Sequence, residues 1–342
     1  MFQINKLQIS LVFMLFIFFH SCVKENKKPD VGHISKTLKI FRTESSFFRS
    51  KNAAELQAVR QQDSVFFDLY VNHLIGDISG GQGATWDQKT EQLLKYITHE
   101  DMTDLLSECS KKFSDFSKYE EGFSDAFQLY KYYLPKRDIP DVYTFVAPFR
   151  AAHPCWDKGL GVALDMYLGE DFSPYYAPML EFPQYQIRKM RPDYLLPNAI
   201  KAWLMSEFLP PSQSTRLIDE MVHTGKILFT LQRLLPETAD SLIIGYQAGK
   251  LEFCQDQETQ IWENIITNKM LYSTDQMGYR GYLGDGPFST GPGVPQEAPP
   301  GIGDWAGWQI VKAFMDKNPK MEIEALFTLP ADQILKESGY KP

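Results

Sequence analysis

Residues 217–235 read LIDEMVHTGKILFTLQRLL and have the pattern of a helix that packs into a protein core. The apolar residues Leu217, Met221, Leu228, Leu231 and Leu235 follow one face of a helix with 3.6 residues per turn. A pair of prolines at positions 210 and 211 precedes this stretch and another proline follows it at position 236, and prolines favour helix boundaries. The pattern predicts a helix over residues 214–235 with one buried face.

Similar helical spacing occurs on both sides of this stretch. It predicts helices in the ranges 54–75, 88–116, 119–134, 193–208, 258–269 and 305–316. Residues 141–149 are rich in β-branched and aromatic residues and predict a strand. Residues 159–169, GLGVALDMYLG, form either a second strand or a short buried segment, in which Asp165 is the one charge and needs a partner. Residues 284–304 are rich in glycine and proline and predict a loop. The expected fold is therefore a mainly α-helical α+β domain over residues 38–342 with a small β-sheet.

The N-terminus has the features of a bacterial lipoprotein signal. Lys6 precedes an apolar run over residues 7–19, which is too short to span a bilayer, and a small residue comes directly before Cys22. The usual leucine three residues before the cysteine is replaced by Phe19. We expect residues 1–21 to be removed, Cys22 to carry fatty acyl chains such as palmitate, and residues 22–37 to tether the domain to a membrane. The protein would then face the periplasm from either the inner or the outer membrane.

Charge and cysteine content exclude several classes of protein. The formal net charge of −8 becomes −9 when residues 1–21 are removed, since Lys6 is their only charge, and this disfavours a nucleic-acid partner. Besides Cys22 the chain has Cys109, Cys155 and Cys254, which allow at most one disulfide and contain no CxxC pair. We expect these three to be buried apolar residues.

Residues 219–223, DEMVH, differ at one position from the HExxH motif of zinc peptidases. In that motif two histidines bind the metal and the glutamate activates the attacking water. Here Asp219 replaces the first histidine, Glu220 and His223 are retained, and Glu258 is a candidate third ligand. Lys226 lies on the same side of the helix, where its ammonium would compete with a cation and pair with Asp219 or Glu220. Two interpretations follow: a divalent-metal peptidase with Glu220 as the base, or a non-catalytic helix that binds no cofactor.

The segment 167–191 combines tyrosines, prolines and basic residues. Aromatic residues and arginine are enriched at the centres of protein interfaces, although the same residues suit a loop that lines the core. We expect this segment and the loop before Trp305 to form a partner surface. Its candidate residues are Asp165, Tyr167, Tyr175, Tyr185, Arg188, Trp305 and Trp308.

Five segments together resemble one known family. These are GVALDMYLGEDFSPYY (161–176), DEMVHTGKILF (219–229), LLPETADSLIIGY (234–246), LYSTD (271–275) and PPGIGDWAGWQIVKAFM (299–315). They resemble the gliding-motility lipoprotein GldB family of the Bacteroidetes. The resemblance implies an envelope lipoprotein required for gliding, in cells whose motility machinery is linked to the type IX secretion system, with partners in that machinery. It also implies a distant similarity to HExxH zinc peptidases, and hence a zincin-like body whose motif is degenerate. Such a protein would be a pseudoenzyme, and it would bind zinc only under the peptidase interpretation.

Overall fold

The computed structural model describes residues 29–76, 83–170, 172, 182–210 and 216–342. By its internal contacts, Val31–Pro342 forms one compact unit, separate from Met1–Asp30, and the fold below is that of Val31–Pro342. The predicted signal peptide and Cys22 lie outside the described residues, as does the first part of the tether. Among the residues that are described, we find no helix with the length and apolar character needed to cross a bilayer.

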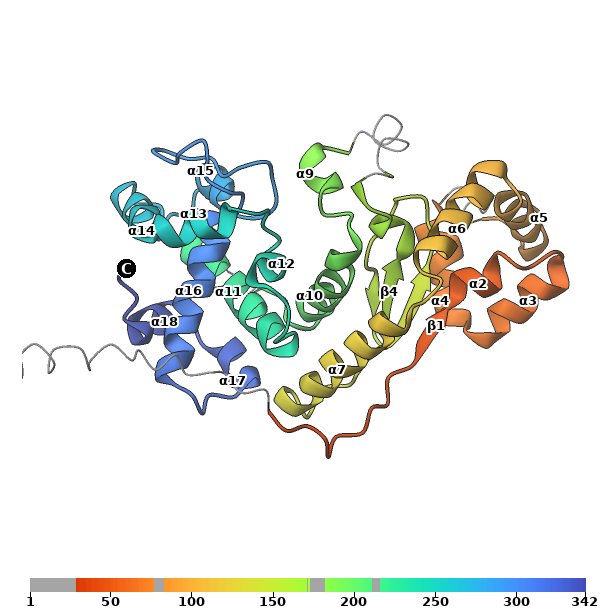
Figure 1. The fold of residues 1–342 in the computed structure, drawn as a ribbon, viewed down its shortest axis with the longest axis horizontal. Helices are drawn as coiled ribbons and strands as arrows, with labels where there is room; N and C mark the ends of the chain where they lie inside the picture. The colour runs from red at the N-terminus through yellow and green to blue at the C-terminus, as the bar shows by residue number, and fades with distance from the viewer. Residues whose placement is uncertain (1–28, 77–82, 171, 173–181, 211–215) are drawn as a thin grey trace, which may run out of the picture. The chain divides into compact units, whose positions relative to one another are not determined.

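A four-stranded sheet lies at the centre of the N-terminal half (Figure 1). Its strands β1 (Ile40–Arg42), β2 (Asp141–Phe145), β4 (Gly159–Ala163) and β3 (Cys155–Trp156) are arranged in that order. The strands β1, β2 and β4 are parallel, and β3 pairs with β4 in the antiparallel sense. The predicted strand at 141–149 is confirmed over its first five residues. The sequence left open whether residues 159–169 form a strand or a short buried segment. They form both, because the strand β4 is followed by a buried 3-10 turn, η3 (Leu164–Tyr167).

The helices before and around the sheet include the predicted helix 119–134 nearly unchanged but divide the predicted ranges 54–75 and 88–116. They are α2 (Thr43–Phe47), α3 (Ala53–Gln62), α4 (Ser64–Leu69) with the π-helical turn η1 (Tyr70–Leu74), α5 (Trp86–Ile97), α6 (Glu100–Lys112) and α7 (Ser117–Tyr133). The predicted helix 54–75 breaks at Asp63, whose carboxylate accepts a hydrogen bond from the Phe66 amide and caps α4. The predicted helix 88–116 breaks before α6, where His99 is the N-cap. Polar N-caps therefore divide stretches that have continuous apolar spacing.

The C-terminal half contains helices and loops but none of the described strands. Its elements are α9 (Gln184–Ile187), η5 (Pro192–Tyr194), α10 (Leu195–Glu207), α11 (Leu217–Leu234), α12 (Asp240–Ile244), α13 (Lys250–Asp256), α14 (Glu258–Thr267), α15 (Gln276–Tyr279), η6 (Arg280–Tyr282), α16 (Ile302–Lys317), α17 (Ile323–Thr328) and α18 (Ala331–Ser338). The helix α10 contacts both the strand β4 and the helix α11, so it joins the sheet to the helical half (Figure 1). The predicted helix around DEMVH is thus confirmed as α11.

The helices α11 and α16 approach each other more closely than side chains would permit. A Cβ atom built on Gly307 would lie 1.8 Å from the carbonyl oxygen of Met221, and one built on Gly225 would lie 2.3 Å from the carbonyl oxygen of Gly307. Real Cβ atoms essentially never come within 3.0 Å of another heavy atom. The two glycines therefore set the distance between these helices, and with it the position of the DEMVH motif.

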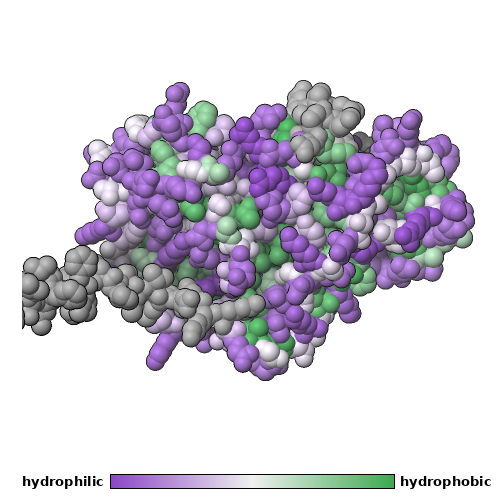
Figure 2. All heavy atoms as spheres, viewed as in Figure 1, coloured by the Kyte–Doolittle hydropathy of each residue, from purple (hydrophilic) through white to green (hydrophobic). Residues whose placement is uncertain are grey.

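Hydrophilic residues cover much of the viewed face, with hydrophobic patches between them (Figure 2). The large hydrophobic side chains that are most exposed come from separate elements, among them Val65, Leu209, Tyr272 and Met277. Exposure of apolar groups alone therefore does not select a partner surface. Cys109 and Cys254 are buried as predicted, whereas Cys155 is only partly buried, and all three are free thiols.

Candidate functional site

Both carboxylate oxygens of Asp219, the residue in place of the first histidine of HExxH, are bound by Arg216. The Arg216 Nε lies 2.8 Å from Asp219 Oδ2, and its Nη2 lies 2.7 Å from Oδ1. The remaining Arg216 Nη1 lies 3.0 Å from Asp332 Oδ2 on α18. Bidentate pairs of this kind combine charge with fixed geometry. The acid at the position of the missing histidine therefore serves to orient an arginine.

The retained histidine of the motif, His223, packs against an aromatic side chain of another helix. The ring of His223 lies edge-on to Phe327 of α17, with 6.5 Å between ring centroids. Burial, assisted by the charge of Lys226, lowers the pKa of His223 to about 4, so its imidazole is neutral at pH 7. Burial also raises the pKa of Glu220, with a further contribution from Asp219.

Lys226 does not pair with Asp219 or Glu220, and that prediction is wrong. Its Nζ donates a hydrogen bond to the carbonyl oxygen of Leu329 at 2.7 Å, just after α17 ends. The last carbonyl groups of a helix lack partners within it, so a buried ammonium can satisfy one. Burial lowers the pKa of Lys226 to about 8.

The structure does not bring Glu258 to the motif. Its Oε1 accepts a hydrogen bond from the Tyr340 hydroxyl at 2.7 Å instead. Within the described ranges, no three His, Cys, Asp or Glu side chains come together as a metal-binding group would. The proposed ligand set of Asp219, His223 and Glu258 is therefore not assembled in this conformation.

Two residues of the predicted partner surface are buried in η3, directly after β4. Asp165 is 1% exposed, and its carboxylate accepts hydrogen bonds from the amides of Ala147 and Phe149 at 3.3 and 2.7 Å. Tyr167 is 2% exposed, and its hydroxyl lies 2.9 Å from His153 Nε2. Burial raises the pKa of Asp165 to about 6. These two residues organise the loops after β2 and β4, so their assignment to a surface is corrected.

The two tryptophans of the predicted surface are also buried. Trp305 is 1% exposed and Trp308 is 0% exposed, because α16 begins at Ile302 and places both rings in the core. Their assignment is corrected in the same way. Tyr185 on α9 is half-buried and Arg188 at the end of α9 is exposed, and its Nη1 lies 3.1 Å from Gln247 Oε1. Tyr175 lies outside the described residues.

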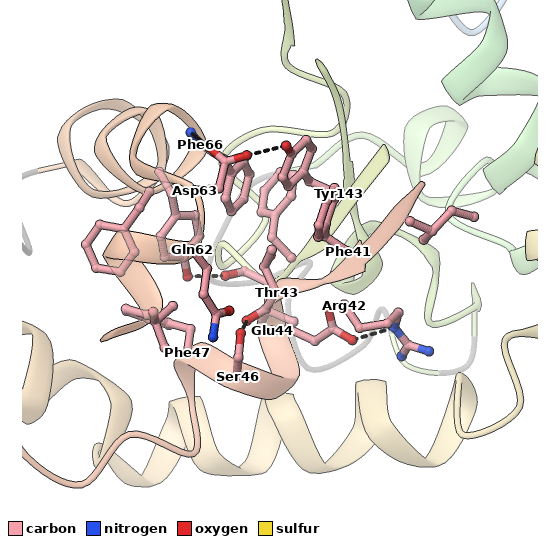
Figure 3. Close-up of a pocket in the computed structure, with 16 residues that line it drawn as sticks. Phe41, Arg42, Thr43, Glu44, Ser46, Phe47, Gln62, Asp63, Phe66 and Tyr143 are labelled. Atoms are coloured by element: carbon pink, nitrogen blue, oxygen red, sulfur yellow. Dashed lines mark hydrogen bonds and ion pairs between the residues drawn. The ribbon is translucent and has the colours of Figure 1, made fainter. Parts of the chain in front are cut away.

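An aromatic pocket that the sequence analysis missed lies beside the sheet (Figure 3). It has a volume of about 550 Å³ and is enclosed by β1, α2, α3, α4 and β2. The ring of Tyr143 stacks between Phe41 and Phe66, with 4.8 Å between centroids on each side. The hydroxyl of Tyr143 donates a hydrogen bond to the carboxylate of Asp63, as Figure 3 shows. Most polar groups at this pocket thus already have protein partners.

A second, polar cavity of about 220 Å³ lies against α10, α11 and the start of α16. Its polar side chains are Lys189, Asn198, Lys201, Thr224, Tyr246, Asp285 and Asp304. The sequence carried one signal for this cavity, since Lys201 is the only charged residue in the apolar stretch 195–205. That signal was missed because its partners come from distant segments of the chain.

Comparison with known families gives one match. The family described as gliding motility protein GldB matches residues 24–342. Comparison with curated proteins and with solved structures gave no significant match, so the zincin-like body stays a prediction. Because the match covers the whole of the compact unit and part of the segment before it, the chain belongs to the gliding motility protein GldB family, and this membership implies an involvement in gliding motility.

Proposed function

We propose that this protein is a non-catalytic structural or assembly component of the gliding machinery, tethered to a membrane of the cell envelope. Family membership supports the link to motility. The observation that carries the non-catalytic role is the bidentate pair between Arg216 and Asp219. A divalent cation at Asp219 would have to displace a guanidinium that already occupies both carboxylate oxygens.

Glu220 separates this proposal from the metallopeptidase interpretation. Glu220→Gln keeps the shape of the side chain but cannot accept a proton from water. The variant should restore spreading of a strain that lacks the gene as fully as the native protein does. The exposed Glu263→Gln on α14 is the matched control. Two results would instead establish a divalent-metal peptidase with Asp219 and His223 as ligands. Gliding would be lost with Glu220→Gln but not with the control, and the native protein would cleave peptides in a chelator-sensitive way.

The partner surface that remains from the sequence prediction is centred on Tyr185 and Arg188. We propose that it contacts another protein of the motility and type IX secretion machinery. The double variant Tyr185→Ala, Arg188→Ala should abolish gliding while the protein stays folded and abundant. Tyr132→Ala, at a tyrosine of α7 that is 43% exposed, is the control for the loss of an exposed aromatic ring. Unimpaired spreading of the double variant would exclude this surface.

The membrane tether is proposed from the N-terminal sequence. Acylation of Cys22 would hold the domain at the membrane, since each buried methylene adds about 0.8 kcal/mol of affinity. The variant Cys22→Ala should lose incorporation of labelled palmitate and appear in the soluble periplasmic fraction. Retention of Cys22→Ala in washed membranes would contradict lipid anchoring.

A further inference from the structure

The polar cavity beside α11 contains two lysines and two aspartates, of which one lysine and one aspartate form an ion pair and the other two do not. The Nζ of Lys189 lies 2.6 Å from Asp285 Oδ1, so these two neutralise each other. Lys201 forms no hydrogen bond or ion pair with the described part of the chain. Asp304 receives a hydrogen bond from the Gly284 amide, 2.7 Å from its Oδ2, and another from Thr224. One positive and one negative group thus share the cavity without direct contact.

Both groups are partly buried. Burial lowers the pKa of Lys201, and burial raises the pKa of Asp304 to about 6, with the nearby ammonium of Lys201 acting in the opposite direction. Asp304 has two hydrogen bonds, whereas the partly buried ammonium of Lys201 has none and would be stabilised by a counter-charge that reaches it. Because Lys201 and Asp304 both line the cavity, a molecule inside it that carries both counter-charges can reach each of them.

We propose that this cavity binds a small zwitterion of the free α-amino acid class, with its carboxylate on Lys201 and its ammonium on Asp304. A lone anion would satisfy Lys201 but meet the carboxylate of Asp304. A lone cation would satisfy Asp304 but meet the ammonium of Lys201. A ligand with both charges gives each of the two groups an opposite charge and places no like charge beside either of them.

The rest of the cavity fits the same ligand. The side-chain nitrogen of Asn198 donates a hydrogen bond to the Tyr167 hydroxyl, which leaves its carbonyl oxygen as an acceptor for an ammonium. Leu228 and Ile243 supply an apolar wall for a small side chain. The volume of about 220 Å³ is below the roughly 300–1,000 Å³ of pockets for drug-sized ligands. The cavity therefore favours glycine, alanine or serine over large amino acids.

This inference is tested by calorimetric titration of the full-length protein in detergent with glycine, L-alanine and L-serine. At least one should bind saturably and raise the unfolding temperature. N-acetyl-L-alanine, which lacks the ammonium, and L-alanine methyl ester, which lacks the carboxylate, should bind at least tenfold more weakly. Three results would overturn the proposal, whatever the variants do. Either derivative could bind as tightly as L-alanine, acetate could bind as tightly as the amino acids, or none of the three amino acids could bind.

Two variants then assign the contacts. Lys201→Met keeps the length of the side chain and removes its charge, and Asp304→Asn keeps an oxygen that can accept from the Gly284 amide. Each should weaken binding at least tenfold, whereas the exposed Lys320→Met should leave it unchanged. A folded Lys201→Met variant with native affinity would refute the role of Lys201. The result is independent of the proposed scaffold function, because gliding is not its readout.

Discussion

The close contact between α11 and α16 predicts a large effect for the smallest possible side-chain addition, Gly307→Ala. The new Cβ atom would lie 1.8 Å from the carbonyl oxygen of Met221. Since this neighbour is helix backbone, it cannot rotate away as a side chain does. The two helices would have to separate by more than 1 Å to restore an ordinary contact of roughly 3 Å.

The net change in stability is the difference between two terms. Alanine in place of glycine within a helix favours the folded state by about 1 kcal/mol. Overpacking a core costs about 1–3 kcal/mol and occasionally more, and here it also loosens the contacts of the buried Trp305 and Trp308. Because a backbone atom is the obstacle, we place the overpacking cost at or above the upper end of that range. The free energy of unfolding should fall by about 2 kcal/mol or more.

The matched control is Gly122→Ala in the interior of α7. There the added Cβ would approach Leu196 Cδ2 at 2.7 Å, which is the far end of a flexible side chain. Urea unfolding followed by circular dichroism should give a lower midpoint for Gly307→Ala and a midpoint at or above the native one for Gly122→Ala. Equal midpoints for the two variants would refute the argument that Gly307 sets the distance between the helices.

Two further predictions concern side chains with defined partners. Arg137 forms ion pairs with both Glu207 and Glu324, each at an N–O distance of 2.8 Å. Arg137→Met should therefore lower the free energy of unfolding, measured in urea, by about 1–2 kcal/mol. The control Lys95→Met, which removes an exposed ion pair, should lower it by about 0.5 kcal/mol or less. The folded protein binds fewer protons at His223 than the unfolded chain between pH 6.5 and about 4, so its stability should fall as the pH falls through this range. His223→Gln should reduce that slope in thermal unfolding curves, and an unchanged slope would contradict a buried neutral imidazole.

The helical class of the fold could be predicted because apolar spacing reports which face of a helix is buried. The spacing identified α11 within three residues at its start, yet it joined α3 to α4 and α5 to α6. These breaks depend on the N-caps Asp63 and His99, which interrupt the backbone without interrupting the apolar pattern. The strand β1 was missed since three residues are too few to show a period.

The site was predicted less well because a sequence motif gives residue types but not their partners. The five residues DEMVH do lie on one helix, as expected. Arg216, the partner of Asp219, lies only three residues before it, so spacing could have identified this pair and it was overlooked. Phe327 beside His223 and Tyr340 beside Glu258 come from distant segments, which spacing does not encode. The same reasoning explains why Trp305 was assigned to a surface, since an aromatic residue after a glycine-rich loop suits an interface and a core equally.

The position of α11 shows what constrains the residues of the DEMVH motif. One face of this helix is fixed by Gly225 against α16, so substitutions there disturb the fold. Two polar groups of the helix instead have polar partners in the protein: Arg216 for Asp219 and the Leu329 carbonyl for Lys226. The substitution Asp219→His would therefore not create a metal site by itself. It would leave Arg216 with only Asp332 as a partner, and the guanidinium of Arg216 would lie beside the two imidazoles. A change of function at this helix requires that the partners change together with the motif.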